Sequence, residues 1–221
     1  MKLIEIINNQ TNYTAIADTI LSSCKPFLTQ IGQNHMKDLI MYRGVDIPDR
    51  YSTIFVLPGY RDNRKPKDTP PAVHNAINTV FKKRFGLPFR NSTFVTGCAA
   101  DTREYGANTY AIIPIGDFKY IWSPTIKDLF VHLKMYLKLE IRAEDPSIYS
   151  KNNSLVNNTL VNYVNTQKFV ELYQDTNLRA AILSNNEVMI YCDSCYYISE
   201  EVYYKILKII MAKRAVANSA T

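Results

Sequence analysis

The stretch STFVTGCAADTREYGANTYAIIPIG, residues 92–116, joins two short apolar runs through a polar connection. The runs at 92–96 and 109–114 are rich in Thr, Val, Ile and aromatic residues, which favour strands. The alanines between them predict a short turn of helix, closed by Tyr105 and Gly106. Short strands that follow one another in groups, without a regular alternation of strand and helix, favour an antiparallel arrangement.

The flanking sequence continues this pattern of short strands in consecutive groups. Helical spacing and end signals predict helices from a cap at Thr11 to Ile31 with a bend or split at Pro26, from Thr69 to Gly86, from Ser123 to about Arg142, from Leu160 to Tyr173, and from Ser199 onward. Short apolar runs predict further strands at 38–45, closed by a turn at 46–49, and at 52–57, 180–183, 187–191 and 196–198, with a polar loop at 145–158. This order predicts an α+β fold with mainly antiparallel sheets.

Composition and missing motifs exclude several classes of protein. With 221 residues, 47% of them hydrophobic, the chain can bury a core, unlike a disulfide-held mini-protein, a disordered tail or a long coiled coil. Its seven glycines never form G-x-G-x-x-G, and neither a P-loop nor a G-x-S-x-G elbow occurs. His35, His74 and His132 lie on different predicted elements without partners at ligand spacing, so no metal site is expected.

Cysteine usage and hydrophobicity predict a cytoplasmic protein. The four cysteines include only one Cys-x-x-Cys pair, Cys192 and Cys195, and are expected to be reduced thiols. The apolar N-terminal start is soon interrupted by Glu5, unlike a signal peptide, and no apolar run reaches the roughly eighteen residues of a membrane span. A composition rich in Asn, Tyr, Lys and Ile suggests an AT-rich genome, such as a virus or phage, for which the host cytoplasm is expected.

The net charge of +6 reflects 26 Lys and Arg against 20 Asp and Glu. Part of it lies in the predicted loop 60–69, which holds Arg61, Arg64, Lys65 and Lys67. Such a loop is either a solvated surface segment or a patch that faces phosphate, on a cofactor or on a nucleic-acid acceptor. Both interpretations stay open.

Three short segments place chemistry-bearing residues at the ends of predicted strands. The stretch MYRGV at 41–45 ends a strand with an arginine and a glycine, and FVTGCAA at 94–100 carries a strand into a short helix. The stretch NNEVMI at 185–190 places a glutamate at the start of a strand, after a polar turn. In this order and spacing, they resemble the arginine, serine-threonine and glutamate motifs of the cholera-toxin-like ADP-ribosyltransferases.

The resemblance runs from about 38 to 198 and is closest over 94–114 and 183–198. It implies two packed antiparallel sheets around an NAD cleft, elaborated by inserted helices. We therefore expect a single domain over 1–221, with a helical N-terminal segment at 1–36, an ADP-ribosyltransferase-like core at 37–198 and a C-terminal helix at 199–216.

The resemblance also implies roles for individual residues. Glu187 would be the catalytic carboxylate, since a fixed negative charge stabilises the oxocarbenium-like state in which nicotinamide leaves the ribose. Arg43 would anchor the NAD diphosphate through its planar donor fork, beside Gly44, and Thr96 would orient Glu187. The aromatic cover of the nicotinamide ring is expected from one of three side chains, namely Tyr42, Phe94 and Tyr105.

The chain departs from the family pattern at two places. The central motif keeps one hydroxyl, on Thr96, and Asn185 takes the position of the first glutamate. An amide cannot act as a base, so the acceptor need not be arginine, and a protein or nucleic-acid group stays open.

We therefore expect a metal-independent mono-ADP-ribosyltransferase that uses NAD, acts on a macromolecular acceptor and has no membrane partner; its oligomeric state is left open. Two alternatives are an NAD glycohydrolase, with water as acceptor, and a non-catalytic basic protein that binds nucleic acid through loop 60–69.

Overall fold

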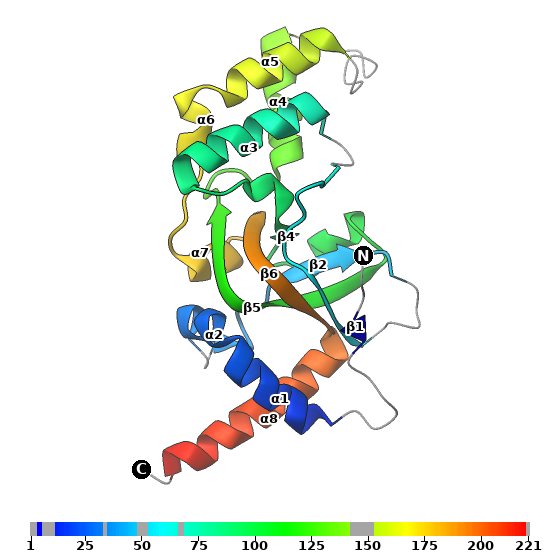
Figure 1. Cartoon of the computed structure of the whole chain (residues 1–221), viewed down its shortest axis with the longest axis vertical. Helices are drawn as coiled ribbons and strands as arrows, with labels where there is room; N and C mark the ends of the chain where they lie inside the picture. The colour runs from blue at the N-terminus through cyan, green and yellow to red at the C-terminus, as the bar shows by residue number, and fades with distance from the viewer. Residues whose placement is uncertain are drawn as a thin grey trace.

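The computed structural model describes residues 4–5, 12–32, 35–47, 53–65, 69–141 and 153–219. At its centre, the described strands form one antiparallel sheet in the order β1-β3-β6-β5-β2, with β4 also paired to β6. Helices lie at both ends of this sheet (Figure 1). The strands are β1 (Ile4–Glu5), β2 (Tyr42–Val45), β3 (Ile54–Pro58), β4 (Thr93–Val95), β5 (Asn108–Trp122) and β6 (Val188–Ser199).

The two long strands β5 and β6 form the spine of the sheet. They pair along most of their length, from Tyr110 opposite Ser199 to Trp122 opposite Val188. Their register shifts after Ile115, where Gly116 has a φ of 69°. Glycine adopts this conformation without steric cost, and such irregularities bend a strand. The pair is therefore strongly curved, as β5 shows in Figure 1.

Two strands pair, one after the other, with the edge of β6 that faces away from β5. β4 pairs with the first residues of β6, with Val95 opposite Val188, whereas β3 pairs with its second half. β2 pairs with the first half of β5, and its Tyr42 also bridges to Thr96, just beyond β4. The prediction of two packed sheets therefore differs from the described strands, which form one connected sheet because β5 and β6 run through both halves.

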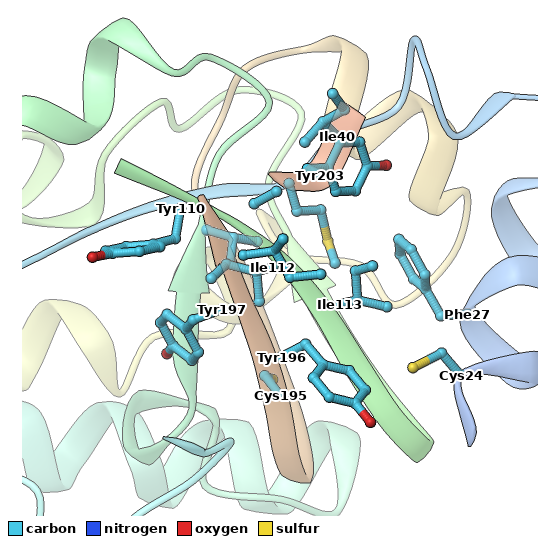
Figure 2. Packing of buried hydrophobic residues seen from close by; sticks show 14 of the residues in the cluster. Cys24, Phe27, Ile40, Tyr110, Ile112, Ile113, Cys195, Tyr196, Tyr197 and Tyr203 are labelled. Atoms are coloured by element: carbon cyan, nitrogen blue, oxygen red, sulfur yellow. The ribbon is translucent and has the colours of Figure 1, made fainter. Parts of the chain in front are cut away.

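Four helices cover one end and one face of the sheet. They share a core with β2, β3, β5 and β6, and Figure 2 shows part of it. Tyr110 and Tyr197 lie on one side of the β5–β6 pair, and Tyr196 lies on the other side with Phe27 and Cys24 (Figure 2). This alternation along the strands buries both faces of the pair. The helices are α1 (Tyr13–Ser23), α2 (Lys25–Ile31), α7 (Leu178–Leu183) and α8 (Glu200–Ser219).

The remaining helices build a second layer at the opposite end, where they enclose a separate core (Figure 1). Ile121 of β5 and Met189 of β6 reach into this core from the sheet. The layer holds α3 (Pro71–Phe85), α4 (Leu129–Ile141), α5 (Ser154–Val164), α6 (Gln167–Glu171) and the 3-10 helix η3 (Phe89–Asn91). A second 3-10 turn, η4 (Ala100–Glu104), connects β4 to β5.

Local end signals predict several elements correctly. The α+β class with antiparallel strands is confirmed. The first helix is split at Cys24, with Pro26 in the first turn of α2. α3 ends at Gly86, whose φ of 83° gives the left-handed C-cap. The predicted strands near 54–57, 93–95 and 109–114 and the short turn of helix at 100–104 are also present.

Other boundaries were predicted wrongly. Residues 180–183 are helical in α7, because Leu178, Ala181 and Ile182 are buried at helical spacing and Asn177 caps the Ala180 N–H. The two strands at 187–191 and 196–198 are one strand, β6, whose polar centre lies opposite Pro58 of β3.

The helix ends also differ. α3 begins after an N-cap at Pro70 rather than Thr69, and α4 begins at Leu129 rather than 123. Part of the predicted loop 145–158 is helical in α5, the predicted helix at 160–173 is divided between α5 and α6, and β2 begins only at Tyr42. The N-terminal segment holds strand β1 besides its helices, and the C-terminal helix runs from Glu200 to Ser219. Thr11, Ser52, Lys67, the turn residues 48–49 and the loop residues 145–152 lie outside the described residues.

Candidate functional site

The candidate site lies where β2, β4 and β6 come together. Arg43 is the second residue of β2, and its Nη1 donates a hydrogen bond to the Phe94 carbonyl of β4 over 2.7 Å. Thr96 follows β4, and its hydroxyl donates to the Asn185 carbonyl over 2.9 Å. Because β4 pairs with the first residues of β6, these bonds bring Arg43 and Thr96 close to Glu187, which immediately precedes that strand.

Backbone contacts hold Glu187 at this position. Asn185 has a φ of 60°, which asparagine tolerates better than most residues, and it turns the chain from α7 toward β6. The Asn186 side chain donates to the Ser123 carbonyl over 2.8 Å, and the Glu187 N–H donates to the Lys127 carbonyl over 2.8 Å. The start of β6 is therefore tied to the segment before α4.

The Glu187 carboxylate is largely buried and has one near charge partner. Its side chain is 14% exposed, and its Oε1 lies 3.8 Å from Nη1 of Arg90. Among the residues that the structure describes, that oxygen has no hydrogen-bond partner. Burial raises the pKa of Glu187 from its ordinary value of 4.5 to about 7, against the opposing effect of the Arg90 charge. The group therefore changes its charge near neutral pH.

Arg90 is fixed from several directions within η3. Its side chain is 7% exposed, and its Nη2 donates to the Thr69 hydroxyl over 3.2 Å. Its backbone N–H donates to the Asn78 side chain over 2.9 Å. Its Nε is buried and has no hydrogen-bond partner in the described part of the chain. A buried guanidinium with an unused donor is costly, and an anionic group that accepts from it would lower that cost.

Phe94 provides an aromatic platform for two arginines. The Cζ of Arg64 lies 3.8 Å from the centre of its ring, and the Cζ of Arg90 lies 4.8 Å from it. Arg64 also donates to the Ser92 carbonyl. Burial, together with repulsion by Arg43 and Arg90, lowers the pKa of Arg64 to about 9, so the group stays charged at pH 7.

Two further polar side chains adjoin Glu187. Tyr173 is 5% exposed, and its hydroxyl has no hydrogen-bond partner within the described ranges. Burial and the Glu187 charge raise the pKa of Tyr173 well above its ordinary value. Asp128 raises the pKa of Glu187 and accepts hydrogen bonds from the Val131 N–H and the Tyr105 hydroxyl. The site is therefore rich in polar groups, some of which have no hydrogen-bond partner among the described residues.

The structure brings together five of the residues predicted from the sequence: Arg43, Arg64, Phe94, Thr96 and Glu187. Arg64 belongs to the predicted basic loop, yet it is half-buried in this site, while its neighbours Arg61 and Lys65 are exposed. Lys67 lies outside the described residues.

Other predicted residues lie elsewhere or serve packing. Tyr42 is buried beside Tyr204 of α8, on the opposite face of β2 from Arg43. Gly44 packs against η4, since a Cβ there would lie 2.1 Å from the Thr102 carbonyl oxygen. Tyr105 is 56% exposed at Asp128, and the Asn185 side chain is exposed at the rim of the site.

The sequence interpretation missed three residues, Arg90, Asp128 and Tyr173. Arg90 lies two positions before the predicted strand at 92–96. Its nearness to this strand, which carries the Thr96 motif, is the sequence signal that could have identified it. Asp128 and Tyr173 lie within or beside predicted helices, where neither stands out from an ordinary surface or core residue. Only their tertiary contacts place them next to Glu187.

Within the described ranges, no three His, Cys, Asp or Glu side chains are grouped so that they could hold a metal ion. The four cysteines are free thiols, and those of Cys192 and Cys195 lie 3.2 Å apart. No helix of the described chain is both long and apolar enough to cross a membrane. No protein-family model, curated protein or solved structure matches this chain.

Proposed function

We propose that this protein transfers ADP-ribose from NAD to a macromolecular acceptor and releases nicotinamide, with Glu187 as the catalytic carboxylate. The observation that supports this proposal is the convergence of Arg43, Thr96 and Glu187 from three strands that are far apart in the sequence. Chance placement of three surface residues does not account for a carboxylate that is only 14% exposed beside a buried arginine. The bent antiparallel sheet is also compatible with an ADP-ribosyltransferase-like fold.

NAD supplies an N-glycosidic bond whose cleavage places positive charge on the ribose and frees neutral nicotinamide. Glu187 in its ionised form stabilises that positive charge and accepts a hydrogen bond from a ribose hydroxyl. The acceptor nucleophile forms the new bond to the ribose carbon and loses its proton. No metal ion takes part in these steps.

Arg43 and Thr96 prepare the site for this step. The Arg43 guanidinium donates one of its five N–H groups to Phe94, which leaves the others for the NAD diphosphate. The Thr96 hydroxyl holds the Asn185 carbonyl and so fixes the turn that presents Glu187. Of the three aromatic side chains expected to cover the nicotinamide ring, Phe94 lies in the site and Tyr105 is exposed at Asp128, whereas Tyr42 faces away.

The side chain of Asn185 limits which acceptor groups the site can activate. It is exposed at the rim of the site, and its amide neither takes up nor releases a proton near neutral pH. An acceptor that depends on a second carboxylate for deprotonation, such as an arginine side chain, therefore fits less well than a group that is already nucleophilic. A protein side chain and a nucleic-acid group remain candidate acceptors.

The test is nicotinamide release from NAD by the purified protein and by two variants. We expect Glu187→Gln to reduce the rate by at least about 100-fold, as the loss of a charge-stabilising group does in other enzymes. Glu171→Gln, which removes an equal charge from an exposed position on α6, serves as the matched control. Equal rates for wild type and Glu187→Gln, or no release by any of the three proteins with lysate present, would contradict the proposal.

A second measurement separates the transferase from its alternatives. The protein is incubated with NAD labelled in the adenosine part and a cell lysate, and the products are digested separately with protease and nuclease. Label that stays on a macromolecule identifies a transferase, and the digest that frees it identifies the acceptor class. Nicotinamide release without retained label indicates a glycohydrolase, and salt-sensitive nucleic-acid binding without release indicates a non-catalytic protein.

A further inference from the structure

Three guanidinium groups from separate segments converge on Phe94, one at its backbone carbonyl and two at its ring. Arg43 of β2 donates to the Phe94 carbonyl, and Arg64 and Arg90 lie 3.8 Å and 4.8 Å from the centre of the Phe94 ring. Two of the three side chains, Arg64 and Arg90, lie outside the segments that resemble the transferase motifs. Their position is set by tertiary packing.

The positive charge of this cluster is not balanced within the described part of the protein. Arg90 has an ion-pair partner, Glu187, but the separation is 3.8 Å and Glu187 itself loses charge near neutral pH. Arg43 and Arg64 each donate a hydrogen bond to a backbone carbonyl, which is neutral. Like charges held this close repel one another, and an anion between them removes that repulsion.

We propose that Arg64 and Arg90 join Arg43 in a binding site for a diphosphate group, of the kind that links the two halves of a dinucleotide or ends a nucleoside diphosphate. This inference rests on the proposed function for the choice of NAD as the natural ligand. Planar guanidinium groups bind phosphate oxygens in pairs, and a diphosphate diester carries two negative charges. The buried Nε of Arg90 is a donor that has no acceptor among the residues described by the structure.

Burial favours a small diphosphate over a nucleic-acid backbone. Proteins that follow a phosphate backbone use exposed lysines and arginines spread along a groove. Here the Arg90 side chain is only 7% exposed, and Arg64 is half-buried against Phe94, while the exposed Arg61 and Lys65 lie outside the cluster. A diphosphate is small enough to be held by guanidinium groups that gather at one residue, whereas a polymer backbone needs cations spread along the surface.

The experiment compares binding of ADP and AMP to the full chain by isothermal titration calorimetry. Both ligands carry the same nucleoside, so their difference isolates the second phosphate. We expect ADP to bind wild type at least about tenfold more tightly than AMP, and we expect Arg64→Gln to lose that preference. Arg84→Gln removes an equal charge from the exposed end of α3 and is expected to keep the preference.

A second variant tests whether a positive charge at position 64 is sufficient for the ADP preference. Arg64→Lys keeps the positive charge but replaces the planar fork by a single ammonium group, so we expect intermediate loss of the ADP preference. Thermal unfolding of each variant in the absence of nucleotide shows whether it is folded. Inorganic pyrophosphate is expected to compete with ADP for wild type and to compete less well for Arg64→Gln.

The inference is overturned if folded Arg64→Gln and Arg64→Lys bind ADP and AMP as wild type does, or if wild type shows no preference between them. Binding of duplex or single-stranded nucleic acid that Arg64→Gln abolishes, without an ADP preference in wild type, would identify the other class of ligand and also overturn it. The result is independent of catalysis. An ADP preference without nicotinamide release contradicts the proposed function alone, and nicotinamide release without the preference contradicts only this inference.

Discussion

The Arg90 guanidinium and the Glu187 carboxylate lie 3.8 Å apart where η3 meets the start of β6, with side chains that are 7% and 14% exposed. In water such a pair would contribute little, but here both groups have lost most of their hydration. Burial outweighs the attraction of Arg90, because the pKa of Glu187 is still raised to about 7. The protonation of this one carboxylate therefore depends on small changes in its surroundings.

The first prediction concerns the pH dependence of NAD cleavage. Glu187 acts in its ionised form, and its pKa of about 7 means that the ionised fraction falls as the pH falls below neutrality. We expect the rate of nicotinamide release under saturating NAD to rise about tenfold per pH unit below pH 7 and to level off above it. Initial rates between about pH 5 and pH 9 measure this, and a flat profile across neutrality would exclude Glu187 as the titrating group.

The second prediction concerns Arg90 as a positioning residue. Its positive charge lowers the pKa of Glu187, so Arg90→Gln is expected to raise that pKa further and to move the pH profile upward by about one unit. The readout is the midpoint of the profile together with the carboxyl chemical shift of Glu187 in a titration followed by NMR. Arg90→Lys is expected to restore part of the shift. A lower rate with an unchanged midpoint would show that Arg90 acts only on binding or folding.

The third prediction concerns stability. The Glu187 carboxyl loses its proton near pH 4.5 in the unfolded chain, but keeps it to about pH 7 in the folded protein. Between these values the folded state binds the extra proton, so this group lowers wild-type stability as the pH rises. Glu187→Gln does not titrate there. We expect its stability relative to wild type to improve by on the order of 3 kcal/mol from about pH 4 to about pH 8, measured by urea denaturation.

One outcome of the denaturation measurement would contradict the prediction for Glu187→Gln. A difference between Glu187→Gln and wild type that does not change with pH would mean that the carboxyl has an ordinary pKa in the folded protein. Glu171→Gln, on the exposed side of α6, is expected to show no such change.

The fourth prediction concerns His74, which is 4% exposed on α3. Its Nε2 lies 3.1 Å from the Asn91 side-chain oxygen and 3.2 Å from the Asn78 side-chain nitrogen. Burial and the Arg90 charge lower the pKa of His74, so the folded protein keeps it neutral at pH values where the unfolded chain is protonated. As the pH falls below about 6.5, the unfolded chain binds a proton at His74 that the folded protein does not bind. The free energy of unfolding therefore decreases. His74→Gln is expected to lose less stability than wild type between about pH 7.5 and pH 5.5, by chemical denaturation.

The fifth prediction concerns Gly97, which follows Thr96 in the site. A Cβ at this position would lie 1.9 Å from the Ile182 carbonyl oxygen of α7 and 2.9 Å from the Asn185 side-chain oxygen. Gly97→Ala must displace backbone, so we expect it to cost more than about 2 kcal/mol and to weaken NAD cleavage. Gly116→Ala meets no atom within 4 Å and pays only for its positive φ, about 1–2 kcal/mol. Equal unfolding midpoints for the two variants would contradict this packing argument.

Local signals in the sequence predict elements whose ends depend on single residues. Gly86 ends α3 because its φ of 83° suits glycine, and Pro26 begins a new helix because proline lacks an N–H donor. The same local reasoning is wrong at 180–183, where a short apolar run fits a strand or a helix equally well. There the burial of Leu178, Ala181 and Ile182 against the sheet determines the helix.

The candidate site likewise combines residues that local sequence signals identify with residues that only tertiary contacts bring there. Arg43, Thr96 and Glu187 could be singled out from the sequence because each lies at the end of a predicted strand within a known motif order. For Arg64 the sequence leaves two interpretations open, a solvated loop or a patch that faces phosphate, since its sequence neighbours are charged and polar. Its contact with Phe94 depends on the path of the chain between β3 and α3, which no local pattern predicts.

By itself, the sequence predicted the class of fold, the antiparallel strands and five of the residues that meet at the site, because strand propensity, helix ends and short motifs are local properties of the chain. Only the tertiary structure decided that the strands form one connected sheet, that Arg64 packs on Phe94, and that Arg90 lies beside Glu187. The physical reason is that burial and charge act through space. Desolvation of Glu187 and repulsion among the arginines arise only when segments distant in the chain are packed together.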